Sequence, residues 1–83
     1  MYEIIVSNKA EEQIKKLPQE LKDRMGCVFE RIKIRPHSFV KRLVGSKYYR
    51  LRVGDYRIIL DIQQDKLVIL IVEIGHRKNI YKN

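Results

Sequence analysis

Residues 48–57 contain two alternating polar and apolar runs that are joined by Gly54-Asp55. This pattern predicts a tight β-hairpin, with strands at 48–53 and 56–62. A two-residue turn fixes the register and predicts five cross-strand pairs: Val53–Tyr56, Arg52–Arg57, Leu51–Ile58, Arg50–Ile59 and Tyr49–Leu60. One face of the hairpin is then apolar, and the other carries Arg50, Arg52 and Arg57.

The predicted pairing of Arg52 with Arg57 is unfavourable by itself, because like charges directly opposite each other destabilise a hairpin. The pair is easier to understand if an anion normally lies beside it. A phosphate backbone is the anion that we expect, since arginine binds phosphate oxygens through two parallel hydrogen bonds.

The net charge of +8 is placed unevenly along the chain. Residues 1–30 hold five Lys/Arg and six Asp/Glu, a net charge of −1, whereas residues 31–83 hold thirteen and four, a net charge of +9. A one-sided positive field favours nucleic acid, an acidic protein segment or an anionic membrane as the partner. The membrane ranks third, because no basic amphipathic helix with bulky apolar anchors is present.

A chain of 83 residues that is 45% hydrophobic and 34% charged is expected to fold as one domain spanning 1–83. The apolar run Leu67–Val72 is too short to span a bilayer, and the N-terminus lacks the features of a signal peptide. We therefore expect a cytoplasmic protein.

The remaining elements follow from periodicity. A strand is expected at 2–6, an amphipathic helix after Ser7-Asn8, a second helix from Pro18 to about Lys33, a loop over 39–47 and a last strand at 67–74. The order β-α-α-β-β-β predicts an α+β fold in which a helical hairpin packs on one face of a small, mainly antiparallel sheet. Cys27 lies in the second helix and is expected to be a buried core thiol.

Metal or cofactor chemistry is poorly supported by the residues. The histidines are His37 and His76, the single cysteine is Cys27, and no spacing resembles a metal-ligand set. The four glycines are isolated, so no phosphate-binding glycine loop is expected.

The chemistry that remains is the electrostatic stabilisation of a phosphodiester reaction. Arg50, Arg52 and Arg57 lie on the predicted hairpin face, and Arg77 and Tyr81 follow the last strand. RNA supplies its own nucleophile in the 2′-hydroxyl, so an enzyme needs mainly to align the attack, neutralise charge and assist proton transfer. Taken singly, each arginine is most often a solvated surface charge, and it is the clustering on one face that favours a site.

Two segments of the chain resemble the RelE/ParE family of toxins from prokaryotic toxin–antitoxin modules. They are Tyr49–Ile59 and Ile74–Tyr81, and the stretch Ala10–Pro18 is similar to the first helix of the family. The resemblance implies one of two activities. RelE-like members cleave messenger RNA in the ribosomal A site and leave 2′,3′-cyclic phosphate ends, whereas ParE-like members poison DNA gyrase.

The resemblance also implies roles for single residues. Arg57, Arg77 and Tyr81 match the active site of the RelE-like branch, with Tyr81 stacking on the substrate or activating it. Arg50 stands where the bacterial archetype has a lysine, and arginine is a poor general acid, so His76 or Lys47 is expected to assist proton transfer. The other basic side chains expected to contact RNA or the ribosome are Lys41, Arg42, Lys47, Arg52 and Lys78.

The sequence therefore predicts a metal-independent, ribosome-dependent endoribonuclease that acts on messenger RNA on 70S-type ribosomes. The resemblance implies that a RelB-like antitoxin wraps the toxin, and that operator DNA is bound only through that complex. Two alternatives are a ParE-like gyrase inhibitor and a basic RNA-binding module without catalysis. The presence of Arg57, Arg77 and Tyr81 together favours the endoribonuclease over the gyrase inhibitor.

Overall fold

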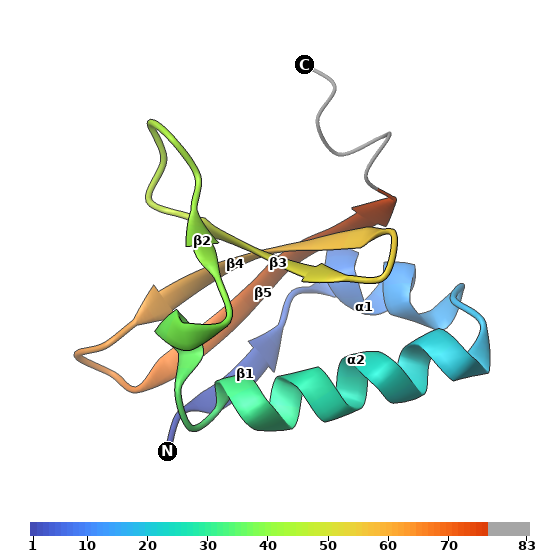
Figure 1. Ribbon diagram of the computed structural model, residues 1–83, viewed down its shortest axis with the longest axis horizontal. Coiled ribbons are helices and arrows are strands. Elements are labelled where there is room, and N and C mark those ends of the chain that lie inside the picture. The colour runs from blue at the N-terminus through green and yellow to red at the C-terminus, as the bar shows by residue number, and fades with distance from the viewer. Residues whose placement is uncertain (77–83) are drawn as a thin grey trace.

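The computed structural model describes residues 1–76 of the chain. Five strands form one mixed sheet in the order β1-β5-β4-β3-β2, with β1 parallel to β5 and every other pair antiparallel (Figure 1). The elements are β1 (Glu3–Val6), α1 (Asn8–Lys15), α2 (Gln19–Ile32), the 3-10 helix η1 (Pro36–Ser38), β2 (Lys41–Arg42), β3 (Tyr49–Val53), β4 (Tyr56–Gln63) and β5 (Val68–His76). The predicted α+β class and its order are confirmed, and β2 is an additional strand within the segment predicted to be a loop.

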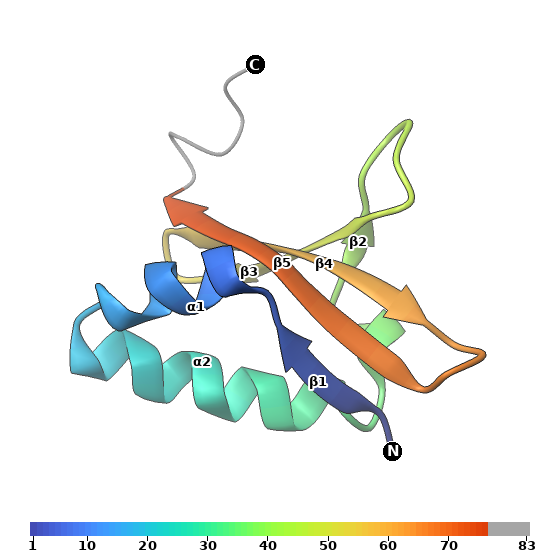
Figure 2. The ribbon, with the colours of Figure 1, turned by 180° about the vertical axis from the view of Figure 1, so that it is seen from behind.

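Both helices begin where the sequence predicts. The Ser7 side chain accepts a hydrogen bond from the backbone N–H of Ala10 at 3.1 Å, which caps α1. Pro18 immediately precedes α2, where its missing N–H costs nothing. The two helices run in opposite directions beside the sheet (Figure 2). No helix within residues 1–76 combines the length and the apolar character that a membrane crossing requires.

The β3–β4 hairpin has the predicted register at all five pairs, from Val53 opposite Tyr56 to Tyr49 opposite Leu60. Gly54 adopts a positive φ of 59°, a conformation that glycine reaches without steric cost. The alternation then places the apolar side chains of both strands on the face that packs against the helices.

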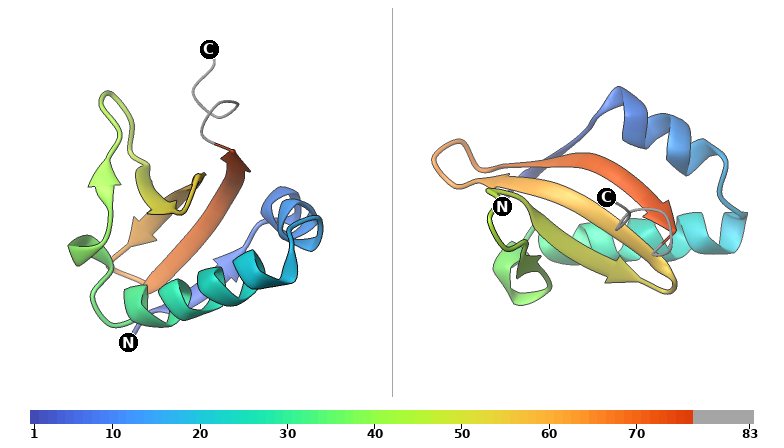
Figure 3. Two further views of the ribbon diagram at one scale, coloured as in Figure 1. Left: turned by 45° about the vertical axis from the view of Figure 1, so that its right-hand side comes forward. Right: turned by 90° about the horizontal axis from the view of Figure 1, so that it is seen from above.

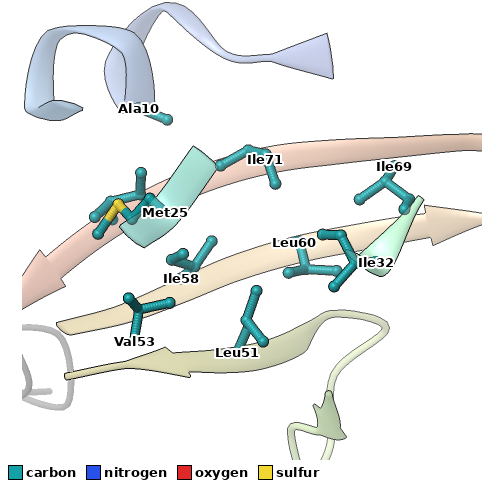
Figure 4. Packing of buried hydrophobic residues seen from close by; sticks show 10 residues of the cluster. Ala10, Met25, Ile32, Leu51, Val53, Ile58, Leu60, Ile69 and Ile71 are labelled. Atoms are coloured by element: carbon teal, nitrogen blue, oxygen red, sulfur yellow. The ribbon is translucent and has the colours of Figure 1, made fainter. Parts of the chain in front are cut away.

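The core lies between this face and the helices (Figure 4). Met25 and Ile32 of α2 and Ala10 of α1 pack over side chains from three neighbouring strands, namely Leu51, Val53, Ile58, Leu60, Ile69, Ile71 and Ile74. Each of these ten residues is at most 3% exposed. Burial of this apolar surface is the main favourable term that holds the helices on the sheet.

The prediction that Cys27 is buried is wrong, because its side chain is exposed. Met25 and Ile32, which are seven residues apart, define the buried stripe of α2. Cys27 is two residues from Met25, and two residues turn an α-helix by about 200°, so Cys27 lies on the side that faces away from the sheet.

An irregularity in β5 changes which of its side chains face the core. Ile59 pairs with Glu73 but the next residue, Leu60, pairs with Ile71, so Val72 is an extra residue in β5. Before this bulge the buried residues are Ile69 and Ile71, and after it the buried residue is Ile74. The bulge therefore moves Glu73 to the face opposite the core.

Beyond the end of β1, α1 lies beside the outer edge of β5 (Figure 3). The backbone N–H of Ser7 donates to the Ile71 carbonyl at 2.9 Å, and the Ser7 hydroxyl donates to the Val72 carbonyl at 2.7 Å. The side-chain oxygen of Gln13 accepts a hydrogen bond from the Ile74 N–H at 2.7 Å. These three bonds satisfy the outer edge of β5 at the bulge and just beyond it.

Candidate functional site

Four basic residues from three strands share the sheet face that lies away from the helices. Arg52 is directly opposite Arg57, and Arg50 is opposite Ile59, as the hairpin register predicted. The additional strand β2 places Lys41 directly opposite Arg50. Because residues that face each other in a ladder lie on the same side of the sheet, Lys41 joins the arginines.

These side chains line a pocket of about 170 Å³. Its lining residues, which we call the arginine pocket, are Phe39, Lys41, Arg50, Leu51, Arg52 and Arg57. Lys41 and Arg52 are exposed, whereas Arg50 and Arg57 are half-buried. No acidic residue is among the lining residues, so a concave surface of one charge sign concentrates anions.

Phe39 lines the pocket but is not among the site residues predicted from the sequence. It directly follows η1, and its N–H donates to the Pro36 carbonyl at 3.2 Å. Pro36 is buried, and the ring of His37 meets the ring of Tyr49 edge-on at 5.5 Å between centroids. In the sequence, the one feature that could have indicated Phe39 as a site residue is its position, two residues before the basic residue Lys41.

Arg42 and Lys47, which were predicted to bind RNA together with Lys41, do not line the pocket. Arg42 pairs with Tyr49 in the ladder, its guanidinium lies 5.6 Å from the centre of the Tyr49 ring, and its Nε donates to the Ser46 carbonyl at 3.3 Å. Lys47 is exposed, with its Nζ 5.5 Å from the centre of the Tyr48 ring. Both cations therefore lie near tyrosine rings. Arg42 lies near Tyr49, the first residue of β3, and Lys47 lies near Tyr48, which directly precedes β3.

His76 is the last residue of β5, and it pairs with the neighbour of Arg57 in β4. It pairs with Tyr56, and the two rings meet edge-on at 5.5 Å between centroids. Tyr56 also pairs with Val53, which is buried on the helix side, so His76 lies on the face opposite Arg57. Gly75 is the residue that pairs with Arg57. The structure therefore separates His76 from the arginine pocket.

The remaining predicted site residues, Arg77, Lys78 and Tyr81, lie outside the described residues. Within residues 1–76, no three or more His, Cys, Asp or Glu side chains come together as a metal site. Lys41, Arg50, Arg52 and Arg57 line the pocket, and such cationic side chains can bind an anion and stabilise negative charge that develops on it.

The fold and the pocket define a class of protein: a small basic α+β protein with a cationic pocket on the uncovered face of its sheet. The sequence model of one family, described as the ParE toxin of the type II toxin–antitoxin system parDE, matches residues 4–81. The chain belongs to this family, and thus to the RelE/ParE superfamily of type II toxins.

Similar proteins carry RelE names. The chain is 29% identical over 87 residues to a protein of Methanocaldococcus jannaschii called "Putative toxin RelE1", a match that covers 99% of this chain and 97% of the relative. A RelE–RelB complex from Pyrococcus horikoshii OT3 contains a similar chain, with 25% identity, a TM-score of 0.82 and coverage of 94% of this chain and 97% of that one. The intact E. coli RelBE toxin–antitoxin complex gives 16% identity, a TM-score of 0.80 and coverage of 92% and 96%, which is a likeness of fold.

Proposed function

We propose that this toxin is a ribosome-dependent endoribonuclease that cleaves messenger RNA in the A site. The observation that supports the proposal best is the arginine pocket, in which Lys41, Arg50, Arg52 and Arg57 surround one space on the open sheet face. RNA brings both the nucleophile and the phosphate, so a pocket of cations supplies much of what the reaction needs.

In the proposed reaction, the 2′-oxygen of one nucleotide attacks the adjacent phosphorus, and the bond from phosphorus to the 5′-oxygen of the next nucleotide breaks. The products are a 2′,3′-cyclic phosphate and a 5′-hydroxyl. Negative charge grows on the phosphoryl oxygens during the attack. Arg57 and Arg50 stabilise this charge, because both are half-buried and their interactions with it are screened less than those of exposed side chains.

The proton that leaves the 2′-hydroxyl passes to solvent water, and a second proton must reach the departing 5′-oxygen. Of the six lining residues, Lys41 is the one with a side chain of a type that can act as a general acid, since arginine holds its proton too tightly. We assign the donation to Lys41, in preference to His76, which lies on the other face, and to Lys47, which does not line the pocket. Arg77 and Tyr81 keep the roles that the resemblance implies, in charge stabilisation and in stacking or proton transfer.

The exposed cations are proposed to hold the RNA and the ribosome. Arg52 extends the pocket toward solvent, and Arg42, Lys47 and Lys78 are the further basic residues proposed to contact RNA backbone. Contacts of this kind contribute affinity that falls steeply with salt concentration. The proposed reaction takes place in the cytoplasm and requires no metal ion or cofactor.

The partners follow from the relatives. The similar chains from P. horikoshii and E. coli are in complexes with RelB antitoxins, and we propose a RelB-like antitoxin for this toxin. Operator DNA is proposed to be bound only through the toxin–antitoxin complex.

A second candidate function is the poisoning of DNA gyrase. The description of the matching family as a ParE toxin favours it. In that case the arginine pocket would serve for binding alone. The two functions predict different damaged molecules in the cell, namely messenger RNA cut within codons or gyrase trapped on cleaved DNA.

The first test is to add the purified toxin to a translation reaction and to map the ends of the messenger RNA. We expect cuts in the A-site codon with 2′,3′-cyclic phosphate ends. Arg57→Ala is expected to slow cleavage about 100-fold or more, as removal of a group that stabilises transition-state charge does. Arg31→Ala is the matched control, because Arg31 is exposed on α2 and does not line the pocket.

Lys41→Arg belongs to the same series. It keeps the positive charge but replaces the ammonium group by a guanidinium, which is a poor general acid, so we expect slower cleavage with ribosome binding retained. Intact messenger RNA together with accumulated gyrase–DNA cleavage complexes would refute the endoribonuclease and support the gyrase inhibitor.

A further inference from the structure

We propose that Phe39 is a stacking platform for one RNA base, so that the arginine pocket and Phe39 together form a nucleotide subsite for single-stranded RNA. The inference rests on the proposed function for its biological substrate. Phe39 would be a base-binding residue within residues 1–76. It is not among the site residues implied by the family resemblance or predicted from the sequence.

The location of Phe39 is the first reason. Phe39 lines the same pocket as Lys41, Arg50, Arg52 and Arg57. The residue is 44% exposed, although its side chain is large and apolar. An aromatic ring that is exposed beside several cations matches the two components of single-strand binding sites, a stacking surface and a positively charged track for the backbone.

The second reason is that the backbone holds Phe39 in place before any ligand binds. η1 is anchored by the buried Pro36, by the ring contact of His37 with Tyr49, and by the hydrogen bond from the Phe39 N–H to the Pro36 carbonyl. Two residues later, Lys41 enters the sheet opposite Arg50. A rigid attachment at both sides reduces the entropy that stacking would otherwise cost.

The size of the pocket is the third reason. Its volume of about 170 Å³ is below the range of roughly 300–1,000 Å³ that is typical of sites for complete small ligands. A space of this size suits a part of a polymer. We infer that a backbone phosphate lies among the arginines and that the attached base lies outside the pocket, against the Phe39 ring.

An acidic protein segment is the other class of ligand that cations attract. Carboxylates would use the cations but would leave the Phe39 ring uncovered, whereas a nucleotide uses the cations and the ring together. The observations therefore favour a nucleotide, and an acidic peptide is included as a competitor in the test.

The chain contains no tryptophan, so Phe39→Trp creates a single fluorescent reporter at the platform. The probe is a four-nucleotide RNA in which every ribose is 2′-O-methylated, which prevents cleavage. The comparison probes are the same backbone without bases and a hexaglutamate peptide. We expect the base-bearing RNA to quench the tryptophan, and we expect the abasic backbone and the peptide to leave most of the fluorescence unchanged.

Ile34→Trp is the control for nonspecific quenching. Ile34 is 64% exposed and does not line the pocket, so the tryptophan of this control should not respond to the base-bearing RNA. Quenching of the Phe39→Trp reporter to the same extent by the abasic backbone would overturn the inference. Equal quenching by hexaglutamate would overturn it in favour of an acidic protein ligand.

Affinity gives a second readout without the reporter. Phe39→Ala is expected to weaken binding of the base-bearing RNA about 10-fold or more and to leave binding of the abasic backbone unchanged, because stacking acts on the base alone. Equal losses for both probes would mean that Phe39 only supports the fold of the pocket, and would overturn the inference.

The nucleotide subsite and the proposed endoribonuclease activity can be refuted independently of each other. Base-dependent quenching without A-site cleavage would support the subsite and refute the proposed enzyme. A-site cleavage by a Phe39→Ala variant that binds base-bearing RNA as tightly as the unmodified toxin would refute the subsite and leave the enzyme standing.

Discussion

Arg52 and Arg57 face each other across the β3–β4 hairpin, an arrangement that stability alone does not favour. Opposite-charge or polar pairs at such positions stabilise a sheet, and like charges weaken it. Lys41 opposite Arg50 is a second like-charged pair on the same face. Two such pairs in one pocket indicate that this surface is suited to binding an anion at a cost to the stability of the fold.

Arg52→Glu tests this cost. The change replaces a like-charged pair by an opposite-charged pair, so we expect the free energy of unfolding to rise by about 0.5–1 kcal/mol at low salt. We expect the same variant to bind RNA more weakly. Urea unfolding at low and high salt is the measurement, and the gain should shrink at high salt because the exposed Arg52 side chain is screened. A loss of stability would show that Arg52 has a structural role instead.

The elements of the sheet differ in how well the sequence predicts them. The hairpin register could be predicted because Gly54-Asp55 marks the turn and the alternation on both sides is regular. β2 could not, because two charged residues, Lys41 and Arg42, carry no periodicity. The face on which Glu73 lies could not be predicted either, since Leu67–Val72 is a continuous apolar run that gives no alternation and does not reveal the bulge.

The residues of the candidate site also differ in whether their positions could be predicted from the sequence. Arg50, Arg52 and Arg57 were predicted to share a face because they alternate within one hairpin, and they do. Lys41 reaches them through β2, and Phe39 through η1, so their positions depend on tertiary contacts that no local pattern encodes. Arg42 was grouped with Lys41, but neighbouring residues in a strand point to opposite faces.

α1 takes the place of a neighbouring strand for the outer edge of β5. Gln13 accepts the hydrogen bond of the Ile74 N–H at 2.7 Å, and Ser7 bonds to the carbonyls of Ile71 and Val72. The next residue after Ile74 is Gly75, which pairs with Arg57. One side chain of a helix thus helps to fix the end of the strand that borders the arginine pocket.

Gln13→Leu removes the acceptor and leaves the Ile74 N–H without its partner. A part-buried orphan N–H costs about 1–3 kcal/mol, so we expect the Ile74 amide to exchange with solvent at least about fivefold faster. Amide hydrogen exchange followed by NMR is the measurement. Gln13→Glu keeps an acceptor at the same distance from the backbone and is expected to retain protection. Unchanged protection in Gln13→Leu would show that the end of β5 is held by its pairing with β4 alone.

At the scale of the whole molecule, positive charge is concentrated in the second part of the chain. Residues 31–83, which supply β2 to β5, carry a net charge of +9, and residues 1–30, which supply β1, α1 and most of α2, carry −1. A basic surface of this kind attracts nucleic acid over long distances and without selectivity. A toxin with such a surface needs a partner that covers the charge, and the RelB-like antitoxin proposed above would do so.

The last prediction concerns the rate at which the proposed antitoxin binds. If acidic segments of the antitoxin are drawn to the basic sheet face, association is steered by charge, and its rate constant should fall roughly 10-fold or more between about 0.02 M and about 0.5 M salt. Stopped-flow mixing of the purified chains measures this rate. The bound toxin should lose RNA cleavage while its far-UV circular dichroism shows that it remains folded.

A toxin variant separates steering from contact in the same experiment. Arg52→Glu lowers the charge of the face by two and should slow association at low salt, with little effect at high salt, where the charges are screened. Arg31→Glu changes the total charge by the same amount, but the change lies on α2, so this variant should slow association less. A rate constant that is independent of salt, or equal effects of the two variants, would contradict steering by the basic face.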